Sequence, residues 1–483
     1  MKQLPVVVIG GGMAGLVAGY QLTLRGLRPL LLEQSAMLGG AVARHTVAGV
    51  ELDAGAESFA VTRPAVTQLL GDLSMAGAVV APAPLGAWVR HEAGSAPLPA
   101  TALLGIPGHV RAADVRRVIG WPGAARATLD TVLPPRFGGP TLGGLVRRRM
   151  GSRVLHRLVE PVVGGVHAFD PSLLEVDAVA PGLTAAIGSA GSLAGAVRTL
   201  RGGTAPGAAV CGIRGGMALL PAALATEITY AGGEVRCGVT VSGLESITDG
   251  WRVHVQGATI DTAAVVVALP ATGISQLLGV VLGDATMPAD SGRSTPVALV
   301  TMVIDDARLD AAPRGTGILV APRATGVLAK ALTHATAKWP WLAATLPAGR
   351  HVLRLSYGRS GFGDGAGRTT AIPAAGNPAA ANQTAAIPAD GDLRAIAVED
   401  ASTLLGLTLR ESDILGSDVV RWRSALPQAR EGHGAAVATL RRAASAQSGL
   451  AIVGSALAGN GLAAVVGDAR AQIDALADRI AAG

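Results

Sequence analysis

The sequence is poor in aromatic residues, cysteine and lysine. Aromatic residues make up 3% of the 483 residues, so the cores must be built mainly from leucine, valine, alanine and glycine. The only cysteines, Cys211 and Cys237, show no metal-ligand spacing. We therefore expect no metal site and a reduced protein in the cytoplasm. Only three of the 40 basic residues are lysines, and this arginine bias is typical of a GC-rich genome.

Long apolar runs and long runs of like charge are also missing. The most apolar segment, 450–467, is interrupted by three glycines and an asparagine, which argues against a membrane-spanning helix. The first expected strand follows the initial methionine so closely that no signal peptide fits before it. The net charge of +6 with 15% charged residues argues against nucleic-acid binding and suits an anionic substrate. We interpret the densest basic cluster, Arg147–Arg149, as an exposed helix face.

The first 33 residues carry the pattern of a dinucleotide-binding βαβ unit. An apolar run, Val6–Ile9, predicts a buried strand, and a glycine-rich turn after it opens a helix. A second strand is expected at 28–32, and Glu33 at its end is placed to accept hydrogen bonds from ribose hydroxyls, which excludes a 2′-phosphate. The residues predicted to surround the pyrophosphate and ribose are Gly10, Gly11, Gly12, Met13, Ala14, Gly15, Glu33 and Gln34.

Two segments after Glu33 indicate which dinucleotide is bound. Leu38-Gly39-Gly40 and Asp53–Ser58 resemble the extended flavin-binding segment of the amine oxidase and protoporphyrinogen oxidase superfamily. NAD dehydrogenases lack this segment. The resemblance therefore implies FAD as the cofactor.

Strand-helix alternation of dinucleotide type recurs in three separate regions. This predicts an α/β fold in which a discontinuous Rossmann-type FAD-binding domain (1–85, 206–290 and 415–483) is interleaved with an α+β substrate domain. Residues 86–205 are expected to form a helical block that contacts substrate and could contact a membrane peripherally. Residues 291–414 are expected to form the substrate-binding sheet region. Within it, 361–391 lack apolar periodicity and predict a flexible insertion.

The C-terminal segment 449–470 again places glycines between a strand and a helix. We expect the N-terminus of this helix to point at the first site, where its backbone N–H groups and dipole would stabilise negative charge at the pyrimidine edge of a flavin. A second nucleotide site is the alternative.

Together these features resemble the FAD-dependent protoporphyrinogen/coproporphyrinogen oxidases over nearly the whole chain. The most specific stretches are 147–183, 214–225 and 421–433; the last contains Trp422, Leu426-Pro427-Gln428 and Gly432-His433. The resemblance implies that Val241 contacts adenine through its backbone and that Trp422 lies near the flavin ring. It also implies further cofactor contacts from Gly40, Ala41, Gly55, Ala56, Glu57, Ser58, Gly454, Asn460, Gly461 and Leu462.

The resemblance implies chemistry that depends on the flavin rather than on a side-chain catalyst. A porphyrinogen would lose six electrons to the flavin, and oxygen would reoxidise it. His167 is the one acid/base candidate, although a structural role suits it better; His167 and Phe169 depart from the family pattern, which normally has Tyr and Gly there. Arginines would bind the propionates. The candidates are Arg63, Arg90, Arg354 and Arg359.

Coproporphyrinogen III is the preferred substrate, because the arginine bias and the start of the chain resemble actinobacterial members. Protoporphyrinogen IX is the near alternative. A flavin amine oxidase or carotenoid-type desaturase, and a porphyrin/FAD-binding protein without turnover, also stay open. With three tyrosines and four phenylalanines, the chain has little material for the aromatic cage of an amine oxidase. The sequence does not predict the oligomeric state.

Overall fold

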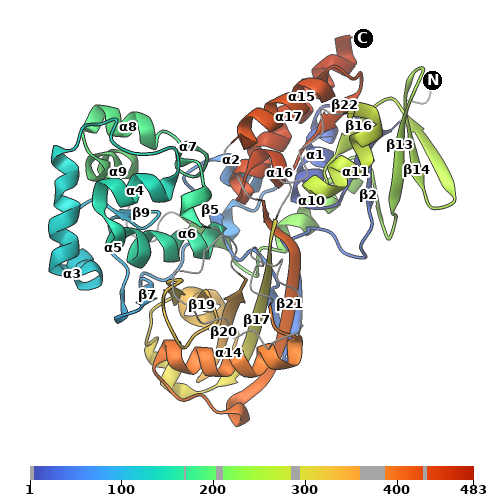
Figure 1. Ribbon diagram of the computed structural model, residues 1–483. Helices are drawn as coiled ribbons and strands as arrows, with labels where there is room; N and C mark the ends of the chain where they lie inside the picture. Colours follow the sequence, from blue (N-terminus) through green and yellow to red (C-terminus); the bar gives the residue numbers. More distant parts are fainter. Residues whose placement is uncertain are drawn as a thin grey trace, which may run out of the picture.

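The computed structural model describes residues 5–167, 170–202, 210–283, 294–358, 387–427 and 432–482. Figure 1 shows three lobes. The first is built from the blue, yellow-green and red parts of the chain, the second contains a large sheet and α14, and the third is a helical lobe coloured cyan to green. The first lobe combines residues that are far apart in the sequence.

The first lobe contains a five-stranded parallel sheet with the strand order β12-β2-β1-β16-β22. The chain leaves β1 toward one side and later adds two strands on the other, so the order reverses between β1 and β16. All strands point their carboxyl ends to one edge, the edge where such sheets bind ligands. The strands are β1 (Val6–Ile9), β2 (Pro29–Glu33), β12 (Glu234–Cys237), β16 (Val265–Val267) and β22 (Leu450–Ile452).

Helices cover both faces of this sheet, which explains why β1, β2, β16 and β22 are apolar on both sides. One face packs against α1 (Met13–Leu24), α2 (Ala65–Asp72), α10 (Leu219–Tyr230) and α17 (Leu462–Ala482). The other packs against α11 (Ala271–Leu282), α15 (His433–Ser445), α16 (Ser455–Ala458) and the three-stranded sheet β13-β14-β15 (Val241–Ile247, Gly250–Val255, Ala258–Thr262). None of the helices that the structure describes is both long and apolar enough to cross a membrane.

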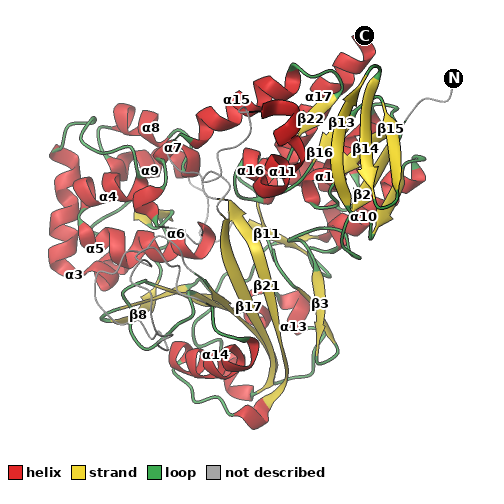
Figure 2. Cartoon of the chain, turned by 45° about the vertical axis from the view of Figure 1, so that its right-hand side comes forward, coloured by secondary structure: helices red, strands yellow, loops and turns green. Residues whose placement is uncertain are grey.

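The second lobe is a seven-stranded sheet with the order β21-β17-β20-β19-β18-β7-β8, antiparallel except between β18 and β7. Figure 2 shows its long strands β17 and β21 running side by side. One face packs against α14 (Asp390–Leu405). The other faces α12 (Ala335–Lys338), α13 (Pro340–Ala343) and the hairpin β3-β4 (Arg44–Val47, Val50–Asp53). The seven strands are β7 (Trp88–His91), β8 (Gly94–Pro97), β17 (Ser294–Asp305), β18 (Gly317–Val320), β19 (Ala331–His334), β20 (Arg350–Tyr357) and β21 (Ile414–Pro427).

The third lobe is helical and has a core of its own. Its helices are α3 (Ala113–Thr128), α4 (Leu142–Met150), α5 (Ser152–Val154), a π-helical turn (Leu155–Val159), α6 (Glu160–His167), α7 (Val176–Val179), α8 (Leu183–Ala190) and α9 (Leu193–Arg201). A short hairpin, β9-β10 (Ala102–Leu103, Ile106–Pro107), lies beside them. The small sheet β5-β11-β6 (Phe59–Ala60, Val210–Ile213, Val79–Val80) joins segments that flank this lobe in the sequence.

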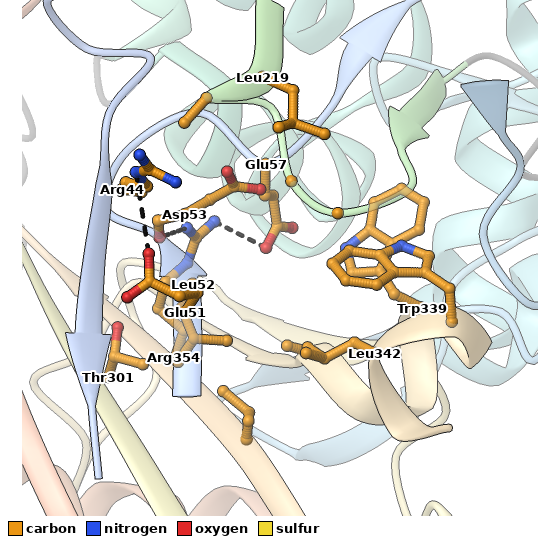
Figure 3. Close-up of a pocket in the computed structure, with 16 residues that line it drawn as sticks. Arg44, Glu51, Leu52, Asp53, Glu57, Leu219, Thr301, Trp339, Leu342 and Arg354 are labelled. Atoms are coloured by element: carbon orange, nitrogen blue, oxygen red, sulfur yellow. Dashed lines mark hydrogen bonds and ion pairs between the residues drawn. The ribbon is translucent and has the colours of Figure 1, made fainter. Parts of the chain in front are cut away.

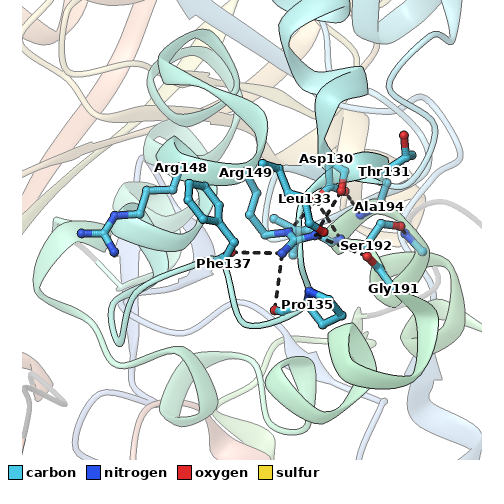
Figure 4. Close-up of polar contacts among 12 residues, drawn as sticks. Asp130, Thr131, Leu133, Pro135, Phe137, Arg148, Arg149, Gly191, Ser192 and Ala194 are labelled. Carbon is cyan, nitrogen blue, oxygen red and sulfur yellow. Dashed lines mark hydrogen bonds and ion pairs between the residues drawn. The ribbon is translucent and has the colours of Figure 1, made fainter.

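A buried ion pair lies inside the helical lobe (Figure 4). The Arg149 Nε donates to Asp130 Oδ1 at 2.6 Å, and both side chains are fully buried. The Asp130 carboxylate also accepts the N–H groups of Leu193 and Ala194 at the start of α9. We expected Arg147–Arg149 to form one exposed face. That interpretation is correct for Arg147 and Arg148 but wrong for Arg149, whose guanidinium donates to five carbonyl oxygens between residues 130 and 137.

The sheet of the second lobe differs from the expected domain bounds at both ends. Strands β7 and β8 come from the region predicted as the helical block, and β21 comes from a region assigned to the FAD-binding domain. Both corrections have one reason: β7 and β21 join the sheet through β18 and β17, which are partners far away in the sequence. The predicted insertion spans 361–391, and its residues 361–386 lie outside the described residues. Its predicted end at 391 overlaps α14, which begins at Asp390.

Candidate functional site

The glycine-rich loop after β1 has separate steric demands at each glycine. Gly10 has φ +108°, and a Cβ there would lie 2.5 Å from the carbonyl oxygen of Ala268. A Cβ on Gly15 would lie 1.9 Å from the carbonyl oxygen of Gly10. Gly12 is different, because a Cβ there would meet no atom within 4 Å. Gly10 and Gly15 are thus required by the fold, whereas Gly12 faces open space at the N-terminus of α1, which suits a phosphate.

Glu33 lies at the end of β2, next to this loop. Its Oε2 accepts the Gly11 N–H at 2.6 Å, and its Oε1 accepts the N–H and the hydroxyl of Ser35 at 2.8 and 2.6 Å. A carboxylate offers about four acceptor positions. Three are occupied here, so Glu33 holds the loop in place and keeps capacity for about one hydroxyl of a ligand. Gln34 beside it is exposed.

The predicted adenine contact, Val241, is brought close to the end of β2 by backbone hydrogen bonds. The Val239 N–H donates to the Glu33 carbonyl oxygen at 2.9 Å, and the Gly238 N–H donates to that of Ser35 at 3.0 Å. These bonds bring the start of β13, with Val241, to the end of β2.

Two further predicted segments are joined to the loop by backbone hydrogen bonds. The Gly39 N–H donates to the Gly11 carbonyl oxygen at 2.8 Å, which places Gly40 beside Gly12. The Ala56 N–H donates to the Ala41 carbonyl oxygen at 2.9 Å. A Cβ on Gly55 would lie 2.1 Å from the Ala41 oxygen, so this close approach requires glycine.

The C-terminal glycines reach the same edge of the sheet. Gly454 follows β22, and Gly461 precedes α17, which begins at Leu462. Gly461 has φ +104° and, like Gly12, faces open space. At the N-termini of α1 and α17, a Cβ on Gly12 or Gly461 would thus meet no atom of the described residues within 4 Å, and such open backbone suits the extended, anionic body of a dinucleotide. The second-site interpretation of 449–470 is not needed to explain these glycines.

A cluster of charged residues is centred on Glu57, which belongs to the segment Asp53–Ser58 (Figure 3). The Glu57 carboxylate pairs with Lys338 at 2.5 Å through Oε1 and with Arg354 at 2.8 Å through Oε2. Burial by itself would raise the pKa of Glu57, but Arg354 and Lys338 outweigh it and hold that pKa at about 2. Lys338 was not predicted from the sequence, since a lone lysine carries no motif.

Arg354 is one of the four arginines predicted to bind a propionate, and in the structure its guanidinium is bound by other groups of the chain. Its Nη1 donates to the carbonyl oxygens of Asp53 and Gly55 at 3.2 and 2.9 Å, while its Nη2 pairs with Glu57. Its guanidinium therefore serves the chain itself. Of the other candidates, Arg63 is exposed, Arg90 is half-buried on β7, and Arg359 lies outside the described residues. The side chain of His167, at the end of α6, also lies outside what the structure describes.

A pocket opens beside this cluster and encloses about 610 Å³, part of it open to solvent. Asp53 and Glu57 line it together with apolar side chains from three regions, among them Leu52, Leu219 and Trp339. Burial raises the pKa of Asp53 to about 6, although Arg354 and the N–H groups of Met217 and Ala218 act in the opposite direction. Asp53 joins β4 to the start of α10, because it accepts the Met217 N–H at 2.8 Å.

The raised pKa of Asp53 gives a testable pH dependence. Its folded pKa of about 6 exceeds the ordinary aspartate pKa of 3.8, so the folded state binds the proton more tightly. The resulting stability is present below pH 3.8 and is lost as pH rises through 6; a shift of this size is worth about 3 kcal/mol. Asp53→Asn, which keeps an acceptor for Met217, should therefore gain stability relative to the parent as pH rises. Urea unfolding of both proteins at pH 4.5 and 7.5 measures this, and a constant difference between them would contradict it.

Known proteins are similar to this chain over nearly its whole length. A model of the family described as flavin containing amine oxidoreductase matches residues 13–471. The chain is 29% identical over 482 residues to "Coproporphyrinogen III oxidase" of Mycobacterium leprae (strain TN), with 98% of each chain covered. It is 25% identical over 491 residues to the protein of that name from Bacillus subtilis (strain 168), with 98% of this chain and 97% of the relative covered.

Solved structures share the fold. A crystal structure from Exiguobacterium sp. 255-15, named "Putative protoporphyrinogen oxidase", matches with a TM-score of 0.82 at 24% identity and covers 99% of both chains. Cyclohexylamine oxidase from Brevibacterium oxydans IH-35A matches with a TM-score of 0.68 at 14% identity, covering 99% of this chain and 100% of that one. The family model spans nearly the whole chain, and the protein therefore belongs to the flavin containing amine oxidoreductase family and binds FAD.

Proposed function

We propose that this protein is an FAD-dependent oxidase that converts coproporphyrinogen III to coproporphyrin III in heme biosynthesis, with molecular oxygen as the acceptor of six electrons. The observation that carries the proposal is the full-length similarity to relatives named coproporphyrinogen III oxidase, from Mycobacterium leprae at 29% and Bacillus subtilis at 25% identity. The cytoplasm is the expected compartment.

Bound FAD would supply the two-electron oxidation itself, and the protein would bind and orient it. We assign the pyrophosphate to the loop Gly10–Gly15 at the N-terminus of α1, and a ribose hydroxyl to Glu33. The N-terminus of α17 at Gly461 would place its positive dipole toward the pyrimidine edge. The remaining assigned contacts come from the predicted residues around Ala41, Gly55 and Trp422, whose Nε1 donates to the Ala54 carbonyl oxygen at 3.0 Å.

The substrate needs partners for its propionates, and the contacts of the candidate arginines support a choice among them. Arg354 is committed to Glu57 and to backbone carbonyls. Arg90 is partly buried, and its Nε forms no hydrogen bond within the described part of the chain. We therefore favour Arg90 over Arg354 as a propionate ligand, with Arg63 as an exposed alternative.

Protoporphyrinogen IX oxidation is the second candidate. It is favoured by the relative "Protoporphyrinogen oxidase, chloroplastic" from Oryza sativa subsp. japonica, which is 26% identical over 380 residues. Amine oxidation is less well supported, because the tyrosines do not form a cage. Tyr20 and Tyr357 lie in separate cores, and Tyr230 is 89% exposed on α10.

The two porphyrinogens are separated by kinetics on the purified holoprotein. Coproporphyrinogen III carries four propionates and protoporphyrinogen IX carries two, so a site with four cationic partners would leave two of them buried and unpaired with the second substrate. Because such a cation costs several kcal/mol, kcat/KM should favour coproporphyrinogen III by about tenfold or more. Porphyrin fluorescence measures both rates. Equal or faster turnover of protoporphyrinogen IX would overturn the preference, and failure to bleach the flavin with either substrate under anaerobic conditions would overturn the proposed activity.

A further inference from the structure

The segment from Ala54 to Ser58 has no regular secondary structure, although the proposed cofactor site depends on it. It connects β4, which ends at Asp53, to β5, which begins at Phe59. Two backbone hydrogen bonds hold it to the preceding loop, from the Ala54 and Ala56 N–H groups to the carbonyls of Ala43 and Ala41. The carbonyl oxygens at the start of the segment accept hydrogen bonds from side chains of other elements.

Those side chains come from the seven-stranded sheet. Arg354 on β20 donates to the carbonyl oxygens of Asp53 and Gly55, and Trp422 on β21 donates to the one between them, that of Ala54. Three consecutive carbonyls are thus bound by two side chains of the second lobe. An irregular segment held in this way adopts one shape only while these donors stay in place.

Glu57 fastens the other end of the segment to the same lobe. Its carboxylate uses one oxygen for Lys338 and the other for Arg354. The three side chains are only 13–16% exposed, and at this burial a carboxylate that loses one cation is left poorly compensated. Arg354 is the centre of the arrangement, since it bonds both to the backbone at Asp53 and Gly55 and to the side chain of Glu57.

We propose that Arg354 and Lys338 are positioning residues for the flavin: they set the shape of the segment Asp53–Ser58 and thereby the flavin contacts assigned to Gly55–Ser58. The inference rests on the proposed cofactor site. Neither cation needs to touch FAD, because each acts through Glu57 or the backbone. As a consequence, the sheet of the second lobe would influence the position of the flavin through the segment Asp53–Ser58.

The test compares FAD binding by Arg354→Met, Arg354→Lys and Lys338→Met with that of the parent protein. Arg350→Met is the matched control, because Arg350 lies four residues earlier on β20 and pairs with the half-exposed Asp305. Apoproteins are titrated with FAD, and the visible spectrum of the bound flavin is recorded. We expect Arg354→Met to raise the Kd for FAD about tenfold or more and to shift the spectrum, as expected when hydrogen bonds to a charged group are lost. Arg354→Lys should recover part of the affinity, and Arg350→Met should match the parent.

A purely structural role gives a different result. It would lower the Tm of the apoprotein while leaving the Kd and the spectrum unchanged, and this outcome in Arg354→Met would overturn the inference. If Arg354→Met does not fold, Lys338→Met decides, since Glu57 then keeps Arg354; an unchanged Kd and spectrum in that variant would equally overturn it. Porphyrinogen turnover is not a readout, so a wrong substrate assignment leaves the test intact. A parent protein that binds no FAD would overturn both the inference and the proposed function.

Discussion

Gly12→Val should yield a folded protein that no longer binds FAD. The backbone at Gly12, with φ −70° and ψ 177°, is one that any residue adopts, and a Cβ there would meet no atom within 4 Å. The fold therefore tolerates the substitution. The valine would instead occupy the open space at the N-terminus of α1, where the pyrophosphate must approach the backbone. We expect far-ultraviolet circular dichroism like that of the parent and no flavin absorbance in the purified protein.

Gly15→Val is the matched control for this result, because it tests a glycine of the same loop that the fold itself requires. A Cβ at Gly15 would lie 1.9 Å from the carbonyl oxygen of Gly10, so the strand and helix could not keep their distance. This variant should fail to fold or should unfold at a much lower temperature. A Gly12→Val protein that retained stoichiometric FAD would show that the pyrophosphate lies elsewhere.

Arg149→Met should destabilise the protein by about 3–5 kcal/mol, the usual cost of removing one partner of a buried ion pair. Asp130 would keep its hydrogen bonds to Leu193 and Ala194 but would lose its only cation within the described residues, at a site fully closed to water. The carbonyls that Arg149 binds in the loop 130–137 would lose their donor as well. Urea unfolding of holoprotein followed by circular dichroism measures the change.

Arg147→Met provides the comparison, since Arg147 lies two residues earlier on α4 and is exposed. Its stability should stay within about 0.5 kcal/mol of the parent, as is usual for surface positions. Because the ion pair lies in the helical lobe, Arg149→Met protein that remains folded should bind FAD with parental affinity. A stability loss equal to that of Arg147→Met would mean that the loop rearranges to satisfy Asp130.

The sequence by itself determined the elements of the five-stranded sheet. Four of its strands, β1, β2, β16 and β22, are short and apolar on both sides. Glycine-rich turns follow β1 and β22, and this pattern is local. The observed β1 at Val6–Ile9, β22 at Leu450–Ile452 and α17 beginning at Leu462 agree with it. The family resemblance identified FAD for the same reason, since its motifs are continuous stretches of sequence.

Only the tertiary structure decided which arginines form ion pairs inside the protein. Arg149 belongs to a run of three similar arginines, and Arg354 looked as suitable for a propionate as Arg90. Arg149 is buried because Asp130 meets it from another helix, and Arg354 is committed because Glu57, 297 positions earlier in the sequence, lies within 2.8 Å. The membership of β7 and β21 in one sheet was likewise decided by distant partners. Ion pairing and strand pairing depend on distances in space, and a local pattern carries no information about which distant residue will supply the partner.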